Sequence, residues 1–292
     1  MNSRSYPFYA VSERFRITGF YSFFRCRYRR GYSFAGEIHD FWECLYVLDG
    51  ELCVTADDRV YHMRQGEIIF HKPLEFHKFT ITSSGASLMI LSFFAEGTAT
   101  DLIQNKVFVL NDRHKEIVEE LLIYAHSYVK GAEAFSEPSE IDIALFLRAS
   151  SEIPHYLQTV TCYLYRLFFS LAECGVDSPI SSSPEILLFR KAVGYLNDNL
   201  HRQPTLEEIA SRCNISQASL ERLFKKYADV GIHRYFLNLK MKIATDLLQK
   251  KESVSQVAEK LGFSDQGYFS RVYKRETGVV PTDVKKGKNI LR

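Results

Sequence analysis

The clearest pattern of apolar and polar positions lies near the C-terminus, where one arrangement occurs twice. Five apolar positions repeat at a constant offset of 48 residues: Leu206, Ile209, Ala210, Cys213 and Ile215 correspond to Val254, Val257, Ala258, Leu261 and Phe263. After a one-residue shift, Leu220, Leu223 and Phe224 correspond to Phe269, Val272 and Tyr273. This spacing puts the apolar residues on one helical face. Each copy therefore predicts a helix, a tight turn and a second helix.

Capping residues mark these predicted helices. In a capping box, a hydroxyl and the side chain three residues later satisfy each other's backbone amides. The sequence offers two such pairs, Thr205 with Glu208 and Ser253 with Gln256. Asn and Gly readily end a helix in the left-handed conformation. The predicted turns and second helix starts are Asn214 and Ser216 in one copy, and Gly262 and Ser264 in the other.

The second helix of such a unit enters the major groove of duplex DNA. With the apolar residues packed inward, the outward face carries Gln217, Ala218, Glu221, Arg222 and Lys225 in the first copy, and Gln266, Gly267, Ser270, Arg271 and Lys274 in the second. We expect Arg222 and Arg271 to contribute most. Each arginine can bind a guanine edge or neutralise a phosphate, and Glu221 can accept from cytosine or stay solvated; the sequence leaves these alternatives open.

A long amphipathic segment, Ile232 to Lys250, joins the two copies. Its apolar stripe consists of Tyr235, Phe236, Leu239, Ile243, Leu247 and Leu248, and its basic residues, Arg234, Lys240, Lys242 and Lys250, fall elsewhere. As a helix it would span roughly 28 Å. Major-groove segments on one side of a duplex lie about 34 Å apart. The connector is therefore long enough to place both reading helices on one duplex.

The charge distribution supports a nucleic-acid partner. The chain has a net charge of +2, but residues 185–292 hold 20 Lys and Arg against 12 Asp and Glu, while the preceding residues hold 17 against 23. A basic half attached to an acidic half is typical of a DNA-binding module joined to another domain. Double-stranded DNA is therefore the expected partner.

The N-terminal part, from about residue 15 to 95, reads as short β-strands. Turn residues occur at Asp49-Gly50, Asp57-Asp58, Gln65-Gly66 and Ser83-Ser84-Gly85. Cys44–Leu48 and Leu52–Thr55, on either side of Asp49-Gly50, predict a hairpin. Several short strands at this spacing indicate a small barrel or sandwich.

One set of spaced residues in this region resembles a known sequence signature. Gly31-x5-Glu37-x-His39-x3-Glu43-x6-Gly50, followed by Gly66 and Pro73-x3-His77, is similar to the cupin barrel signature. Glu37 stands in place of its first histidine, and the second motif has altered spacing and lacks its asparagine. The resemblance implies a barrel with a polar interior site.

Two interpretations of that interior compete. His39, Glu43 and His77, with Glu37, could hold a metal for oxygenase or isomerase chemistry. Because one histidine is missing and the second motif is degraded, we expect instead a metal-free and cofactor-free pocket, without catalytic residues. These four residues, beside Phe41 and Phe76, would then bind a small-molecule effector such as a sugar. His71 or His77 could equally be a barrel-rim histidine, and Trp42, on the opposite strand face, is expected to pack.

Two apolar helices are predicted between barrel and repeat. Asp112–Lys130 and Pro154–Cys174 carry apolar stripes that need a partner surface, either the barrel or a second copy of the chain. Ser178–Pro184 is a Ser/Pro linker. The six cysteines lack CxxC spacing and are expected to be reduced core thiols. Neither a signal peptide nor a membrane-spanning run is found, so we expect a cytoplasmic protein.

The segment Gly262-Phe-Ser-Asp-Gln-Gly-Tyr-Phe-Ser-Arg-Val-Tyr-Lys-Arg275, followed by Gly278 and Pro281, closely resembles the C-terminal signature of the AraC/XylS family of bacterial transcription regulators. Departures are Asp229, Val284 and Lys285, where the family usually has glycine, an aromatic residue and arginine. The resemblance implies a homodimeric regulator of promoter DNA, more commonly an activator, that acts on RNA polymerase. A constitutive DNA-binding protein with a purely structural barrel, and a metal-dependent cupin enzyme tethered to DNA, are the alternatives.

The expected fold is thus α+β. Residues 1–110 form a cupin-like effector-sensing β-barrel, 111–177 a helical dimerisation segment, 178–184 a linker and 185–292 an all-α double helix-turn-helix domain.

Overall fold

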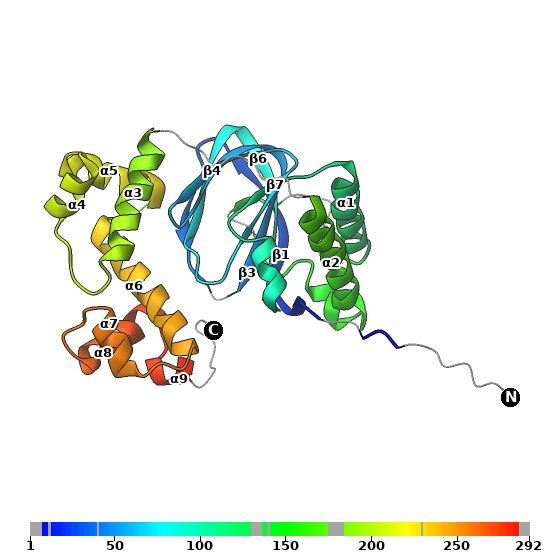
Figure 1. Cartoon of the computed structure of the whole chain (residues 1–292). Helices are drawn as coiled ribbons and strands as arrows, with labels where there is room; N and C mark the ends of the chain where they lie inside the picture. Colours follow the sequence, from blue (N-terminus) through cyan, green and yellow to red (C-terminus); the bar gives the residue numbers. More distant parts are fainter. Residues whose placement is uncertain are drawn as a thin grey trace.

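The computed structural model describes residues 8–10, 13–39, 41–129, 136–138, 141–174, 184–228 and 230–285. Figure 1 shows a β-barrel in the middle, two long helices against one side of it and the C-terminal helices on the opposite side. The α+β class expected from the sequence is confirmed. Most of the expected linker, and Asp229, lie outside the described residues.

The barrel is a seven-stranded sheet with antiparallel pairing throughout. Its strands are β1 (Arg16–Arg29), β2 (Ser33–Glu37), β3 (Trp42–Ala56), β4 (Arg59–Arg64), β5 (Glu67–His71), β6 (His77–Glu96) and β7 (Val107–Val109). The order is β1-β6-β3-β5-β7, with β2 paired to β6 and β4 paired to β3. The long strands β3 and β6 pair with each other over most of their length and form the frame of the barrel.

The predicted hairpin at Asp49-Gly50 is wrong. The chain does not reverse there, because β3 runs through both residues and β6 runs through the expected turn at Ser83-Ser84-Gly85. Gly50 has a φ of 84°, and a Cβ there would lie 2.2 Å from the Gly85 oxygen. The two turn-like sequences face each other across a β-bulge, where the paired strands bend together. The turns predicted at Asp57-Asp58 and Gln65-Gly66 are confirmed.

Alternate residues of β3 serve two different cores. Leu45 and Val47 belong to the barrel interior, whereas Trp42, Cys44 and Tyr46 pack under the helices. The expectation that Trp42 serves packing is therefore confirmed. This division follows from the two-residue period of a strand.

Helices α1 (Asp112–Ser127) and α2 (Tyr156–Cys174) cover one face of the barrel, with the 3-10 helices Thr98–Leu102 and Arg148–Ser151 nearby. Their inward side chains join those of β3, β5 and β6 in a single core, among them Ile117, Leu121, Leu164 and Phe168. Both helices had been predicted from their apolar stripes. Most of each stripe is used to cover the barrel.

The C-terminal part contains α3 (Pro184–Asp198), α4 (Leu206–Cys213), α5 (Gln217–Ala228), α6 (Ile232–Gln249), α7 (Val254–Lys260), α8 (Gln266–Thr277) and α9 (Pro281–Lys285). One core joins α3, α4, α5 and the start of α6, and a second joins the rest of α6 with α7, α8 and α9. The repeated pattern of helix, turn and helix is therefore confirmed, with α6 as the shared connector (Figure 1).

The predicted caps are present with one exception. Thr205 with Glu208 and Ser253 with Gln256 form capping boxes, and Asn214 and Gly262 are left-handed. Ser216 accepts from the Ser219 amide. Ser264 does not cap α8, because the neighbouring Asp265 accepts the Tyr268 amide at 2.7 Å. The charged carboxylate is the stronger acceptor at a helix N-terminus.

Lys240 departs from the sequence-based expectation that it lies off the packed face of α6. It is buried, and its Nζ donates to the Arg202 oxygen at 3.1 Å and to the Leu261 oxygen at 2.8 Å. Gly262 meets the same loop, because a Cβ there would lie 2.1 Å from the His201 oxygen. Lys240 and Gly262 thus join the second unit to the first and fix the position of α8 relative to α5.

Candidate functional site

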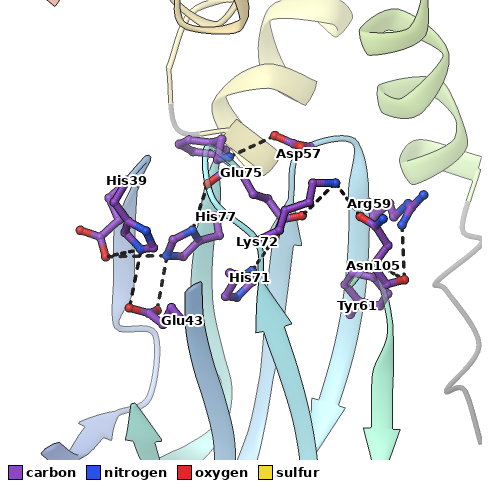
Figure 2. A network of polar contacts seen from close by, with 12 residues as sticks. His39, Glu43, Asp57, Arg59, Tyr61, His71, Lys72, Glu75, His77 and Asn105 are labelled. Atoms are coloured by element: carbon purple, nitrogen blue, oxygen red, sulfur yellow. Dashed lines mark hydrogen bonds and ion pairs between the residues drawn. The ribbon is translucent and has the colours of Figure 1, made fainter. Parts of the chain in front are cut away.

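A compact polar cluster lies at one end of the barrel (Figure 2). Glu37 ends β2, His39 lies in the segment that follows, Glu43 is in β3 and His77 begins β6. One ligand atom from each residue lies within 4.8 Å of those of the other three. The structure thus brings together all four residues predicted to bind the effector. His39, however, lies before β3 rather than within it.

The two imidazole rings face the two carboxylates. The Nε2 of His77 lies 3.4 Å from Glu43 Oε1 and 3.7 Å from Glu37 Oε1. The Nε2 of His39 lies 3.8 Å from Glu43 Oε2 and 3.9 Å from Glu37 Oε1. His39, Glu43 and His77 are buried, while the Glu37 side chain is 47% exposed. Glu37 therefore forms the open side of the cluster.

Backbone carbonyls and neighbouring rings hold the histidines in place. His39 Nδ1 lies 3.0 Å from the Phe41 oxygen, and its ring stacks on Phe41 at 3.8 Å between centroids. His77 Nδ1 lies 3.2 Å from the Glu75 oxygen, and its ring stacks on His71 at 4.2 Å. Because carbonyls only accept, both Nδ1 atoms carry hydrogen, and both Nε2 atoms are aimed into the cluster.

Burial and ion pairing act on the ionisable groups in opposite directions. Burial lowers the pKa of His39, and the neighbouring charge of His77 lowers it further. Burial also opposes the charged forms of His77 and Glu43. The facing carboxylates nevertheless raise the pKa of His77, and the facing histidines lower the pKa of Glu43. The two carboxylates therefore favour a positive charge between them, carried either by His77 or by a bound cation.

A second polar network lies behind the first and was not predicted. His71 Nδ1 lies 2.8 Å from Glu75 Oε2, and Lys72 donates to the Asn105 side chain at 2.7 Å. The His71 pKa is well below its ordinary value because the residue is buried. The i,i+4 spacing of His71 and Glu75 was the available sequence indication. In Figure 2 this network continues from the cluster through the stacked rings of His71 and His77.

Phe76 does not line the polar cluster, contrary to expectation. It packs with the core of α3, α4 and α5, and its ring meets Tyr235 of α6 edge-on with centroids 6.3 Å apart. The reason is strand alternation: His77 points into the barrel, so the preceding side chain points out of it. Phe41, by contrast, stacks on His39 as an aromatic wall of the site.

The barrel and the C-terminal helices are joined around Phe76. The Asp57 carboxylate accepts from the Phe76 amide at 3.0 Å and pairs with Lys242 of α6. Lys78 donates to the Lys226 oxygen at 3.1 Å. A cavity of about 480 Å³ lies between the two parts, lined by Lys78 and Lys226 among others.

The residues predicted to read DNA lie on α5 and α8. Nine of the ten are exposed: Gln217, Ala218, Glu221, Arg222, Lys225, Gln266, Gly267, Arg271 and Lys274. Ser270 is half-buried and donates to the Gln266 oxygen at 2.8 Å, which makes it a weaker candidate. Lys225 also lines the cavity against the barrel. Its side chain therefore lies at the border between the reading face and the barrel.

Within the described residues, no helix has the length and apolar character needed to cross a membrane. Five cysteines there are free thiols, and one of them, Cys162, is exposed rather than part of a core.

Comparison with known proteins gives two matches to sequence families. Residues 209–287 match a helix-turn-helix domain, and residues 24–94 match a cupin domain. The chain is 26% identical over 253 residues to the HTH-type transcriptional regulator YfiF of Bacillus subtilis, covering 83% of this chain and 76% of the relative.

Two further relatives match over most of their length. The Msm operon regulatory protein of Streptococcus mutans is 26% identical over 265 residues, which is 88% of each chain. The HTH-type transcriptional activator RhaR of Enterobacter sp. is 24% identical over 263 residues, covering 85% of this chain and 86% of the relative. All three relatives are described as regulators rather than enzymes.

Proposed function

Because the chain belongs to the AraC family of transcription regulators, with an N-terminal cupin sensor domain and a C-terminal helix-turn-helix domain that binds DNA, we propose that a small molecule bound in the barrel controls its action on promoters. One observation carries this proposal. The cluster of Glu37, His39, Glu43 and His77, buried except at Glu37, adjoins the contact between the barrel and the helix that connects the two reading units.

The effector site is assigned to these four residues. Carboxylates and imidazoles provide hydrogen-bond partners for hydroxyl groups, and Phe41 offers a flat apolar surface beside His39. Small-molecule sites combine a few such polar groups with aromatic walls. A sugar or another polyol is the effector class that this chemistry fits.

The DNA interface is assigned to the outward residues of α5 and α8. Arg222 and Arg271 are exposed and carry the planar donor group suited to guanine edges and phosphates. Lys225 and Lys274, one turn further along each helix, supply charge for the phosphate backbone. The expected target is promoter DNA in the cytoplasm, read at two adjacent groove segments.

Transmission runs through the contact around Phe76. His77 is part of the effector site, and the adjacent Phe76 packs against Tyr235 in α6. An effector shifts the regulator between two conformations only if it binds them with different affinity. A ligand that moves His77 also moves the adjacent Phe76, which packs against α6. Such a ligand binds with different affinity to conformations that differ in this contact.

The proposed regulator is a homodimer and an activator of transcription. Ile123 on α1 and Phe169 on α2 remain exposed on the helices that cover the barrel, and they offer an apolar surface for a second copy. The full-length relative RhaR is described as an activator, which supports the same sign of regulation here, exerted through RNA polymerase.

The test begins by selecting DNA sites from a random library with the purified chain, then measures binding by fluorescence anisotropy. We expect Arg222→Ala and Arg271→Ala each to weaken binding by about 1–3 kcal/mol. Lys250→Ala, which removes one exposed charge at the C-terminal end of α6 in the same domain, is the matched control and should have a smaller effect.

These measurements test the reading helices and the sensor role of the barrel separately. Full affinity in both arginine variants would refute the assignment of the reading helices. A thermal-shift screen with sugars and other metabolites then tests the barrel. If no ligand raises the melting temperature of the wild type, the barrel is structural and the chain binds DNA constitutively.

A further inference from the structure

The cavity between the barrel and the C-terminal helices is a candidate binding site of its own. We propose that it holds a small phosphate monoester, which ties α5 to the barrel and takes Lys225 away from DNA. The site is separate from the polar cluster, because the strand residues that line it point out of the barrel. Its effect on DNA rests on the proposed function, whereas binding of the ester does not.

Strand register builds the wall of this cavity on the barrel side. Ser33 of β2 pairs with Thr80 of β6, which pairs with Cys53 of β3. Cys53 pairs in turn with His62 of β4. Directly paired residues lie on one face of a sheet, and all four line the cavity. The neighbouring Phe79 points into the barrel interior instead. The outer face of four strands therefore presents a row of mostly polar side chains to the helical domain.

The cavity is positively charged. Lys78 of the barrel and Lys225 and Lys226 of α5 line it, together with Glu185, which pairs with Lys226. With His62 neutral, the lining side chains that the structure describes thus carry a net charge of +2. A phosphate monoester carries about −1.5 to −2 near pH 7. The volume of about 480 Å³ is also ordinary for a small-molecule site. Charge and size therefore both suit such an ester.

Lys78 is the most buried of the three lysines, with 5% of the residue exposed. Its Nζ donates to the Lys226 oxygen, in the last turn of α5, at 3.1 Å. A carbonyl carries no net charge, so a dianion in the cavity would add an ionic partner to this hydrogen bond. The positive field reaches Cys53: burial raises the pKa of its thiol to about 11, and the charges of Lys78 and Lys226 act to lower it. An anion is thus the ligand that this field favours.

Hydroxyl and amide groups add hydrogen-bonding capacity around the lysines. Thr55 is buried directly opposite Lys78, and the Ser33 and Thr80 hydroxyls lie 3.0 Å apart at the rim. The first turn of α3 reaches the cavity at Ile186 and brings the positive end of a helix dipole. Lysines combined with these groups suit the several oxygens of a phosphoryl group, and the remaining hydroxyls suit the alcohol groups of the ester.

Lys225 connects the cavity to DNA binding. It is exposed on the outward face of α5 and also lines the cavity. One ammonium group cannot serve the ester and the DNA backbone at the same time, and one phosphate contact is worth about threefold in affinity at moderate salt. The ester would also bridge Lys78 and Lys226, which holds α5 against the barrel. We therefore expect the ester to weaken DNA binding.

The binding test is isothermal titration calorimetry of the full chain with glycerol 3-phosphate, in a phosphate-free buffer at fixed ionic strength. We expect one equivalent in the wild type and none in Lys78→Met. Lys225→Gln, at an exposed side chain that does not threaten folding, should weaken binding about tenfold or more. Lys274→Gln, at the corresponding position of α8 outside the cavity, is the matched control and should bind the ester fully. Glu37→Gln, in the polar cluster, should also bind it fully.

Three further ligands define the chemical class. Inorganic phosphate should bind more weakly than the ester, whereas glycerol and succinate should give no measurable heat. Succinate that binds as tightly as the ester overturns the assignment to phosphate. Absence of binding by both phosphates, or full ester binding by Lys78→Met and Lys225→Gln, overturns the site itself.

Fluorescence anisotropy with the selected DNA site tests the effect on DNA. Added glycerol 3-phosphate should weaken binding by the wild type and by Lys274→Gln about threefold or more, and should leave Lys225→Gln unchanged. Unchanged affinity in the wild type despite bound ester overturns the coupling. Normal ester binding by a chain that binds no selected DNA site overturns the proposed function instead.

Discussion

Replacement of Gly262 by alanine tests how the two helix-turn-helix units are held together. Gly262 has a φ of 65°, and an added Cβ would lie 2.1 Å from the oxygen and 2.5 Å from the carbon of the His201 carbonyl. These atoms belong to the backbone, so the loop must move by about 1 Å or more to reach an ordinary contact. Left-handed alanine costs about 1–2 kcal/mol, and overpacking adds about 1–3 kcal/mol. We expect Gly262→Ala to lose about 2–5 kcal/mol.

Gly278 offers a matched control. It also has a positive φ, 79°, but nothing lies within 4 Å of an added Cβ. Gly278→Ala should therefore lose only the conformational term, about 1–2 kcal/mol. The difference between the two variants isolates the contact between Gly262 and His201.

The assay is urea unfolding of the full chain, followed by far-ultraviolet circular dichroism for the helical domain, with DNA affinity measured on the same samples. Gly262→Ala should also bind DNA more weakly, because the moved loop displaces α8 relative to α5. Equal destabilisation by the two alanines, or unchanged DNA affinity in Gly262→Ala, would refute the reasoning.

Three further predictions concern packing, charge and assembly. Burial lowers the pKa of Lys240 to about 8. Above that pH the folded state binds fewer protons than the unfolded state, so stability rises with pH up to the ordinary lysine value. Lys240→Met should flatten this rise between about pH 8 and pH 10.5 in urea unfolding, and an equal slope in both proteins contradicts the assignment. A double-mutant cycle of Asp57→Asn and Lys242→Met should give a coupling energy of about 1 kcal/mol for this partly buried pair; additive effects on unfolding mean that the pair does not hold the domains. Ile123→Glu and Phe169→Glu should shift a dimer toward monomer in sedimentation velocity with little loss of barrel stability, because these side chains are 60% and 49% exposed. A dimer that persists in both variants places its interface elsewhere.

Local and periodic features were accessible from the sequence. The two helix-turn-helix units follow from apolar spacing, and capping pairs such as Thr205 with Glu208 act within one helical turn. The outward faces of α5 and α8 are fixed once the inward residues are known, because a helix has a constant period. The two-residue period of a strand likewise placed Trp42 in the packing core rather than in the barrel interior.

Features that depend on pairing between distant segments were misread or missed. Asp49-Gly50 has the composition of a hairpin turn, but β6 pairs with β3 on both sides of it, and this pairing makes it a bulge. Lysine is usually a surface residue, so the sequence placed Lys240 off the packed face of α6. Its burial depends on two carbonyls, at Arg202 and Leu261, that only the packing of both units brings to it.

The polar cluster depends both on local sequence patterns and on pairing between distant segments. The sequence by itself pointed to the four residues of the cluster, through strand alternation at Glu43 and through the resemblance to the cupin signature, but it left open whether His77 belongs to the site or to the barrel rim. Only the tertiary structure decided that Glu37 and His77, forty residues apart along the chain, meet on paired strands. It also decided that the two Nε2 atoms share one space between the carboxylates. That convergence depends on the register of β2 on β6, a long-range pairing that no local pattern encodes.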